Sequence, residues 1–182
     1  MTELAFTVLG RPQPAGSKRA FPVRRGGRVT GVAVSEDNVR AKPWQALVAA
    51  AAVDALGEER KLAGPLVLEV DFYFARPAGH YGKGRNAGTV RAAAPRYPAT
   101  RPDTTKLLRG LEDALNGLVW RDDSQIVDQR ARKLYGDPER AEVLLTTVDA
   151  SLQGIDDRLG QISQPRPLYG EARDLFAEER ER

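Results

Sequence analysis

Three aspartates in the middle of the chain have the clearest potential for chemistry. The segment RPDTTKLLRGLEDALNGLVWRDDSQIVD, residues 101–128, places Asp103 just before a leucine-rich stretch and Asp122 and Asp123 shortly after it. Carboxylates can hold a hard cation such as Mg²⁺, which in turn can activate water and stabilise charge on a phosphate group. The question is whether these aspartates form two halves of one metal site.

A purely structural explanation competes with the metal site. An aspartate just before a helix accepts hydrogen bonds from free backbone N–H groups and complements the helix dipole, so Asp103 suits a helix cap. The RDDSQ stretch, residues 121–125, suits a polar loop between a helix and a strand. A straight helix followed by a strand that runs back along it would also keep the two acidic ends about 20 Å apart. Residue types and spacing alone therefore favour a cap and a turn.

The distribution of charge favours the metal site. Asp122 and Asp123 are adjacent, and like charges that close repel unless a cation, a basic neighbour or water offsets them. Residues 11–28 contain six Lys or Arg and no acid, and residues 76–109 contain eight, with Asp103 as the sole acid. This combination is expected where carboxylates hold a cation against a phosphate while bases hold the rest of a polyanion. Solvated basic loops remain the alternative for both segments.

The elements that must position these residues follow from hydrophobic periodicity. Helices are predicted over residues 103–117 and from a cap within residues 35–38 to about residue 56. Strands are predicted over residues 3–9, 66–75, 125–135 and 141–149, of which the last two should pair as a hairpin. Residues 10–31 suit a mobile basic loop or a loose hairpin, and residues 77–100 form a long loop, which is typically functional or disordered.

These elements predict an α/β fold of the α+β type. A small mixed sheet of about four strands should pack with the two main helices in one domain over residues 1–150, because 182 residues suit a single domain. Residues 151–182 are expected to be a C-terminal appendage, partly helical or flexible. Trp44 and Trp120 are expected in the core rather than as wedges that stack on bases.

Composition excludes several classes of protein. The chain has no cysteine and a single histidine, which excludes disulfides, thiol catalysis and the common zinc modules. It lacks an apolar run long enough to span a membrane and the basic start of a signal peptide, so a cytoplasmic location is expected without a membrane partner. The formal net charge of +3 says little by itself about a nucleic-acid partner.

The stretch PDTTKLLRGLEDALNG followed by WRDDSQIVD resembles the signature of RusA-type Holliday junction resolvases, which are crossover-junction endodeoxyribonucleases. The resemblance covers roughly residues 2–148, and the block from the helix to DDSQ is its specific part. It implies a RusA-like mixed α/β homodimer that uses Mg²⁺ to cut symmetrically across a four-way DNA junction in recombination and repair. Mn²⁺ is expected to be able to replace Mg²⁺.

The resemblance also implies site residues. Asp103 matches the first aspartate of the family motif Asp-x-Asp-Asn-x-x-Lys and Asp123 matches the last metal-binding aspartate, with Asp122 as the neighbouring acid. Asp103, Asp122 and Asp123 are thus the expected metal ligands, and Asp103 and Asp123 are also expected to be catalytic. Asp113 matches the aspartate of the DAL sequence.

Three positions depart from the family motif. Thr105 stands where the second aspartate belongs, Lys106 replaces the asparagine and Arg109 replaces the lysine. Thr105 offers the metal a neutral, weaker ligand, while Arg109 keeps a charge that suits phosphate neutralisation, so it is expected to be catalytic in that sense. Glu69 or Asp71 on the central strand could supply the missing carboxylate.

The implied activity is a Mg²⁺-dependent, structure-selective DNA endonuclease that resolves Holliday junctions by paired cleavage of phosphodiester bonds. Several further bases are expected to hold DNA phosphates without reading the sequence. They are Lys18, Arg19, Arg24, Arg25, Arg28 and Lys106. The alternative is a protein on the same scaffold that binds branched or duplex DNA without cutting it, because Thr105 has weakened the metal site.

Overall fold

A computed structural model describes residues 2–148 of this chain apart from residues 17, 37, 59 and 60. All helices and strands of the described residues belong to one compact unit, Met1–Thr147. The appendage predicted over residues 151–182 lies outside the described residues. No helix in the described part of the chain is long and apolar enough to cross a membrane.

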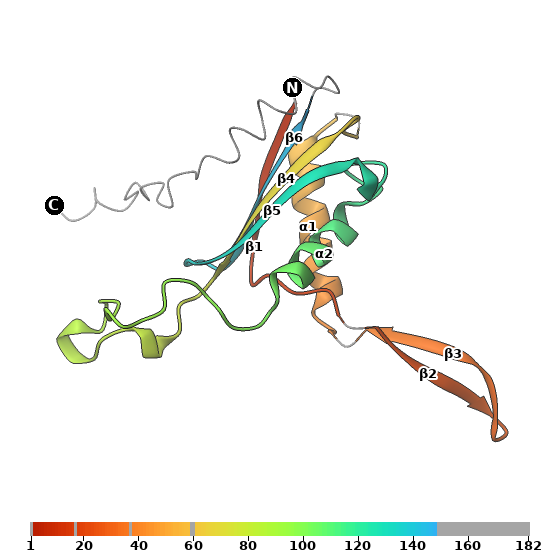
Figure 1. Ribbon diagram of the computed structural model, residues 1–182, viewed down its shortest axis with the longest axis horizontal. Coiled ribbons are helices and arrows are strands. Elements are labelled where there is room, and N and C mark those ends of the chain that lie inside the picture. Colours follow the sequence, from red (N-terminus) through yellow and green to blue (C-terminus); the bar gives the residue numbers. More distant parts are fainter. Residues whose placement is uncertain (1, 17, 37, 59–60, 149–182) are drawn as a thin grey trace. The chain divides into compact units, whose positions relative to one another are not determined.

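A mixed four-stranded sheet forms the centre of this unit (Figure 1). Its strands are β1 (Glu3–Leu9), β4 (Leu66–Phe74), β5 (Ile126–Tyr135) and β6 (Arg140–Thr147), in the spatial order β1-β6-β4-β5. Strand β6 pairs antiparallel with β1 and β4, whereas β4 and β5 are parallel. Parallel neighbours require a crossover, and helix α2 (Thr104–Leu115) provides it. The prediction of a small mixed sheet with two main helices is confirmed. The prediction that the last two strands pair as a hairpin is wrong, because β4 lies between β5 and β6 and pairs with both.

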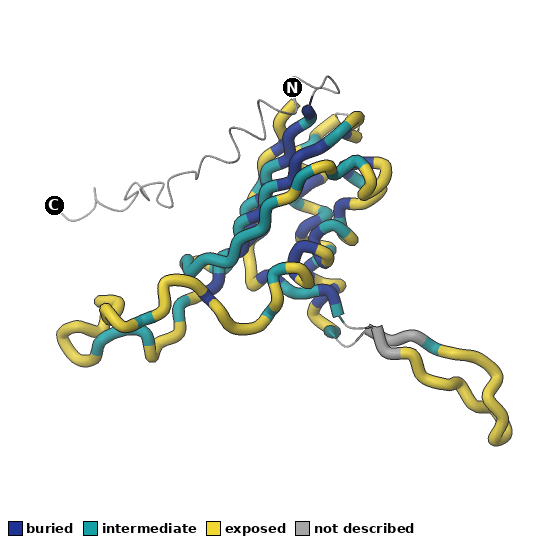
Figure 2. The backbone as a smooth tube through the Cα atoms, viewed as in Figure 1, coloured by how far each residue is buried: buried dark blue, intermediate teal, exposed yellow. Residues whose placement is uncertain are grey.

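Helices α1 (Ala41–Leu56) and α2 cover one face of the sheet (Figure 1). Alternate residues of β4 point into this layer and are buried, which explains the period of two in the sequence. The core joins them to the leucine stripe of α2 and to one side of α1, and Figure 2 shows this buried layer. Trp44 and Trp120 are 3% and 0% exposed, so the expectation that both are core residues is confirmed.

The basic segment near the N-terminus forms a hairpin of β2 (Lys18–Arg25) and β3 (Arg28–Glu36). Gly26 and Gly27 connect the strands with φ values of 55° and 77°, the left-handed conformation that two-residue hairpin turns require. Of the two expectations for this segment, the hairpin is correct. The hairpin is exposed over most of its described length (Figure 2).

Helix α1 begins later than predicted, at Ala41, because residues 28–36 belong to strand β3. Asn38 helps to start the helix, since its Oδ1 atom accepts a hydrogen bond of 3.1 Å from the Arg40 N–H. Its Nδ2 atom also donates to the Pro14 carbonyl at 2.9 Å. Asn38 thus ties the start of α1 to the segment that follows β1.

The long loop after β4 has an internal structure. It contains two single-turn 3-10 helices, Ala78–His80 and Gly84–Asn86. The Gly82 N–H donates to the Thr89 carbonyl and the Arg91 N–H to the His80 carbonyl, each at 2.9 Å, so the two sides of the loop are hydrogen-bonded to each other. The base of the loop is fixed to the end of β5 through Tyr135. The Arg76 guanidinium lies 4.1 Å from the centre of the Tyr135 ring, and the His80 ring packs edge-on against it.

Candidate active site

Asp103 occupies the N-cap position of α2, but its side chain is not used as a cap. Its backbone is extended, with φ −71° and ψ 138°, and among the described residues its carboxylate accepts no capping hydrogen bond. The carboxylate is 62% exposed and lies 3.8 Å from the Lys106 ammonium. Asp103 therefore has the position of a helix cap, but its carboxylate is not used for capping and is available to a ligand.

A basic cavity of about 580 Å³ opens at this end of α2. Four of its lining residues are cationic, and Asp103 is the only acid among them. The lining residues are Arg11, Pro12, Gln13, Pro14, Asn38, Arg40, Arg101, Pro102, Asp103 and Lys106. A cavity with this charge can accept a phosphate group beside a carboxylate.

Gly110 allows the segment after β1 to form a wall of this cavity. A Cβ atom at residue 110 would lie 3.0 Å from the Ala15 nitrogen and 3.2 Å from the Gln13 oxygen, so the backbones approach closely because residue 110 is glycine. The Ala15 N–H donates to the Lys106 carbonyl at 2.8 Å in the same contact. The sequence gives no sign of this wall, because residues 11–15 and α2 are far apart along the chain.

Asp122 forms the turn that residue types favoured. Its Oδ1 atom accepts a hydrogen bond of 2.9 Å from the Ser124 N–H and caps the 3-10 helix Asp123–Gln125. Gln125 completes a capping box by accepting hydrogen bonds from the backbone N–H groups of Arg121 and Asp122. The hydrogen bond from Ser124 lowers the pKa of Asp122. A direct role of Asp122 in metal binding stays a prediction.

Asp123 is an exposed carboxylate held by a buried ring. The indole nitrogen of Trp120, whose side chain is fully buried, donates to Asp123 Oδ1 at 2.9 Å. Since the ring is locked in the core, this hydrogen bond fixes the direction of the carboxylate. Trp120 therefore orients Asp123 while staying inaccessible to DNA.

Glu112 is a second carboxylate at this end of α2, and sequence reasoning did not select it. It is half-buried, and Gln129 Nε2 donates to its Oε1 atom at 3.2 Å. Burial raises the pKa of Glu112, and the nearby charge of Asp123 raises it further. Its only signal in the sequence was its place on the polar side of the predicted helix. The influence of the Asp123 charge on Glu112 depends on how the chain continues after α2.

We expect Glu112→Gln to stabilise the metal-free protein at neutral pH, raising its melting temperature by about 1 to 3 °C. Burial and the charge of Asp123 raise the pKa of Glu112 in the folded protein, so folding favours the protonated carboxyl and is opposed by the charged one. The stability associated with that proton is present below the ordinary glutamate pKa and is lost as the pH rises through the folded value. Thermal melts in EDTA from about pH 4 to about pH 8 should show a difference that grows with pH. A difference that stays constant across that range would contradict this explanation.

The two acidic groups lie at opposite ends of α2. The twelve residues of the helix span about 18 Å at 1.5 Å per residue. Strand β5 runs back along it, because Gln129 contacts Glu112 while Lys133 further along donates to the Pro102 carbonyl at 2.9 Å. Within the described residues, no group of three or more Asp, Glu, His or Cys side chains could hold a metal ion. A single chain therefore keeps Asp103 and Asp123 apart, as the spacing argument indicated.

Comparison with known proteins identifies the family to which this chain belongs. The profile of the family Endodeoxyribonuclease RusA matches residues 12–146. The chain belongs to the RusA family. An uncharacterized protein of Bacillus subtilis strain 168, YqaN, is 31% identical over 147 residues, which cover 81% of this chain and 98% of that protein. Family membership implies nuclease chemistry on DNA.

Thr105 and Arg109, which depart from the RusA family motif, are both exposed on α2. Lys106 lines the basic cavity. Arg24, Arg25 and Arg28 are exposed at the end of the β2–β3 hairpin, while the side chains of Lys18 and Arg19 are outside what the structure describes. The predicted roles of these residues stay predictions.

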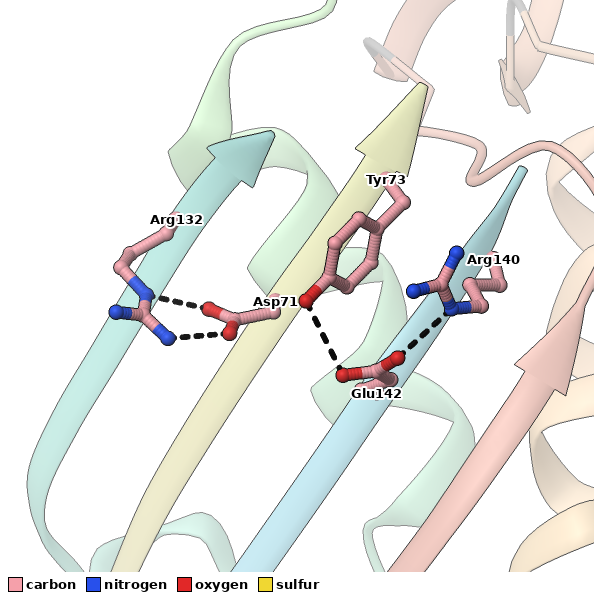
Figure 3. Close-up of polar contacts among 5 residues, drawn as sticks. All are labelled: Asp71, Tyr73, Arg132, Arg140 and Glu142. Carbon is pink, nitrogen blue, oxygen red and sulfur yellow. Dashed lines mark hydrogen bonds and ion pairs between the residues drawn. The ribbon is translucent and has the colours of Figure 1, made fainter. Parts of the chain in front are cut away.

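Asp71 is engaged elsewhere and is a poor replacement for the missing RusA aspartate. Figure 3 shows its carboxylate in a two-pronged ion pair with Arg132. Glu69 and Asp71 alternate with the buried residues of β4, so they lie on the sheet face opposite the helices. On that face Glu142 accepts hydrogen bonds from Tyr73 Oη at 3.2 Å and Arg140 Nε at 2.7 Å (Figure 3). These charges neutralise one another and stabilise the sheet.

Proposed function

We propose that this protein is a Mg²⁺-dependent endonuclease that cuts four-way DNA junctions as a homodimer. The match to the RusA family over residues 12–146 is the observation that carries this proposal. Asp103 supports the proposal, because its exposed carboxylate lies among four cationic residues that line a cavity of about 580 Å³. Such surroundings suit a cation and a DNA phosphate that bind together.

A second copy of the chain would complete the metal site. Asp103 and Asp123 are separated by the length of α2 in one chain. A two-fold axis can bring the N-terminal end of α2 in one copy to the C-terminal end in the other. Each end would then combine Asp103 of one copy with Asp123 of its partner. The dimer would contain two equal sites, as two symmetric cuts require.

The donor set fits Mg²⁺, because carboxylate oxygens are the hard ligands that this ion prefers. When bound, Mg²⁺ would lower the pKa of a water molecule and offset charge on the phosphate during hydrolysis. Asp103 and Asp123 would hold the ion, with Asp123 oriented by Trp120. Arg109 and Lys106 would neutralise the phosphate, and the arginines of the hairpin would hold the DNA arms.

The purified protein is expected to cut a synthetic four-way junction in Mg²⁺ and to lose all cutting in EDTA, because its carboxylates alone cannot generate hydroxide near neutral pH. A linear duplex with the same sequence should be cut far more slowly. Denaturing gels of end-labelled strands would measure both rates. Paired cuts at symmetric positions are expected, and Mn²⁺ should restore cutting after EDTA treatment.

One observation favours a second function, a junction-binding protein that does not cut. Thr105 removes a carboxylate from the family motif, which weakens the end of the site that contains Asp103. Binding of the four-way junction without cutting in Mg²⁺ or Mn²⁺ would establish this alternative. Binding that is insensitive to salt, or no binding at all, would contradict both functions, since phosphate contacts release counterions.

A further inference from the structure

The loop between β4 and α2, residues 75–102, is a strongly basic segment. It contains six Lys or Arg residues and no acidic residue. Most of the loop is exposed, and it extends beyond the sheet and the two helices (Figure 1 and Figure 2). A loop of this length in a compact domain is typically functional or disordered, and the hydrogen bonds within this one favour a function.

Two of the basic side chains hold the loop in shape. Arg76 Nη1 donates to the Pro95 carbonyl at 2.8 Å, and Arg91 Nη1 donates to the Gly79 carbonyl at 2.9 Å. Each of these hydrogen bonds joins the side of the loop that leaves β4 to the side that returns to α2. The loop is therefore ordered by its own arginines and backbone, without an acidic residue to offset their charge.

Both ends of the loop are attached to strand β5. Near its start, the Arg76 guanidinium lies 4.1 Å from the centre of the Tyr135 ring. Near its end, Lys133 Nζ donates to the Thr100 carbonyl at 2.7 Å and to the Pro102 carbonyl at 2.9 Å. These contacts fix the direction in which the loop leaves the sheet.

Lys83 and Arg85 are the basic residues at the tip of the loop, between the hydrogen-bonded residues Gly82 and Thr89. Both are exposed, and among the described residues neither forms a hydrogen bond or an ion pair. Exposed cations on an ordered support with no acid nearby create a positive potential that attracts a polyanion.

The basic cavity at Asp103 connects this loop to the β2–β3 hairpin. Arg101, near the end of the loop, lines the cavity. So do residues 11–14, which precede the hairpin in the chain, and Asn38 and Arg40, which follow it. Both basic segments therefore start at the place where the proposed function puts the scissile phosphate.

We propose that the loop of residues 75–102 binds the sugar-phosphate backbone of a duplex arm of the junction, with Lys83 and Arg85 as its phosphate contacts. This inference rests on the proposed action on four-way DNA and adds a binding surface to it. The tip of the loop extends away from the helices, so its contacts lie on an arm rather than at the phosphate that is cut (Figure 1). Contacts of this kind position DNA without reading its sequence.

Replacing Lys83 and Arg85 together by Gln is expected to weaken binding of a long-armed four-way junction about tenfold at low salt. The slope of log K against log salt concentration should fall by about 1.8, because two phosphate contacts are lost. Fluorescence anisotropy of the full chain at several salt concentrations would measure both quantities. The titrations are made in EDTA, so that binding is measured without cutting.

A second variant, in which Asn-Gly replaces residues 83–88, removes the tip of the loop. The Gly82 N–H donates to the Thr89 carbonyl at 2.9 Å, so a two-residue turn can close the loop at this point. It should show the same losses as the double substitution. The matched control is Lys42→Gln combined with Lys61→Gln, which removes the same charge from exposed residues outside the loop. Its affinity should stay within about twofold of that of the original protein.

The length of the arms tests where the loop binds. When the arms of the junction are shortened step by step, the difference in affinity between the double variant and the original protein should disappear once the arms no longer reach the loop. A difference that persists in the shortest junction would place these contacts at the crossover and overturn the assignment to an arm.

Equal affinity and equal salt slope in the loop variants and the original protein would overturn the inference, as would an equal loss in the control variant. So would weaker binding that follows from a loss of dimers in analytical ultracentrifugation, because the loop would then be a contact between copies. If the loop variants bind junctions more weakly but the original protein cuts none, the proposed nuclease function fails and this inference stands. If junctions are cut and the loop variants bind them normally, the reverse holds.

Discussion

A mixture of the Asp103→Asn and Asp123→Asn variants is expected to nick a four-way junction although neither variant alone does so. In the proposed dimer, each site combines Asp103 of one copy with Asp123 of the other. A heterodimer of the two variants has one site with both aspartates and one with neither. Equal mixing makes about half of the dimers heterodimers, so nicking should reach about a quarter of the original rate.

Mixed dimers can be obtained by co-expression with two different affinity tags. The original protein should cut both strands in pairs, whereas the heterodimer has one complete site and should only nick. Denaturing gels measure nicking, and native gels measure full resolution of the junction. Each homodimer should still bind the junction with unchanged salt dependence, which separates an effect on chemistry from an effect on binding. A mixture as inactive as its components would place the two aspartates of a site in one chain.

Replacing Arg24, Arg25 and Arg28 together by Gln is expected to weaken junction binding by about 30- to 100-fold at low salt. All three side chains are exposed near the Gly26–Gly27 turn of the hairpin. Removing one arginine that binds a phosphate should reduce the slope of log K against log salt concentration by about 0.9, and removing all three should reduce it by about 2.7. Fluorescence anisotropy at several salt concentrations would measure both quantities.

The matched control for this variant removes the same charge elsewhere. Lys42, Lys61 and Arg121 are exposed bases outside the hairpin, and their joint replacement by Gln also lowers the formal net charge from +3 to 0. If both triple variants bind equally weakly, net charge rather than the hairpin accounts for the weaker binding. A hairpin variant with unchanged affinity and slope would show that the hairpin does not contact DNA.

The sequence was sufficient to predict the two main helices and the four strands of the central sheet, because their signals are local. The leucine stripe predicted α2 and the alternation of residues 66–74 predicted β4, since each pattern depends only on spacing along one element. The hairpin of residues 18–36 was ambiguous because Arg and Gly dilute its alternation, and the start of α1 was misplaced for the same reason. The ends of the elements thus depended on pairings that the local pattern does not contain.

The candidate site was harder to predict from the sequence, because its contacts join distant parts of the chain. The pairing of Asp71 with Arg132 follows from the register of β4 and β5, which no local pattern determines. The charge of Asp123 acts on Glu112 only because the chain after α2 places the two residues at the same end of the helix. Asp103 could be selected from the family motif, whereas its separation from Asp123 needed the observed direction of β5.

Helix α2 is more than a crossover between two parallel strands. Its hydrogen-bonded backbone makes it a spacer of fixed length, about 18 Å, between the residues that would belong to two different sites. In the proposed dimer, the distance between the two cut positions is therefore a property of a rigid helix and cannot adjust to the substrate. Any mismatch with the spacing of the scissile phosphates must be accommodated by the DNA, so the protein would select junctions by how easily they deform.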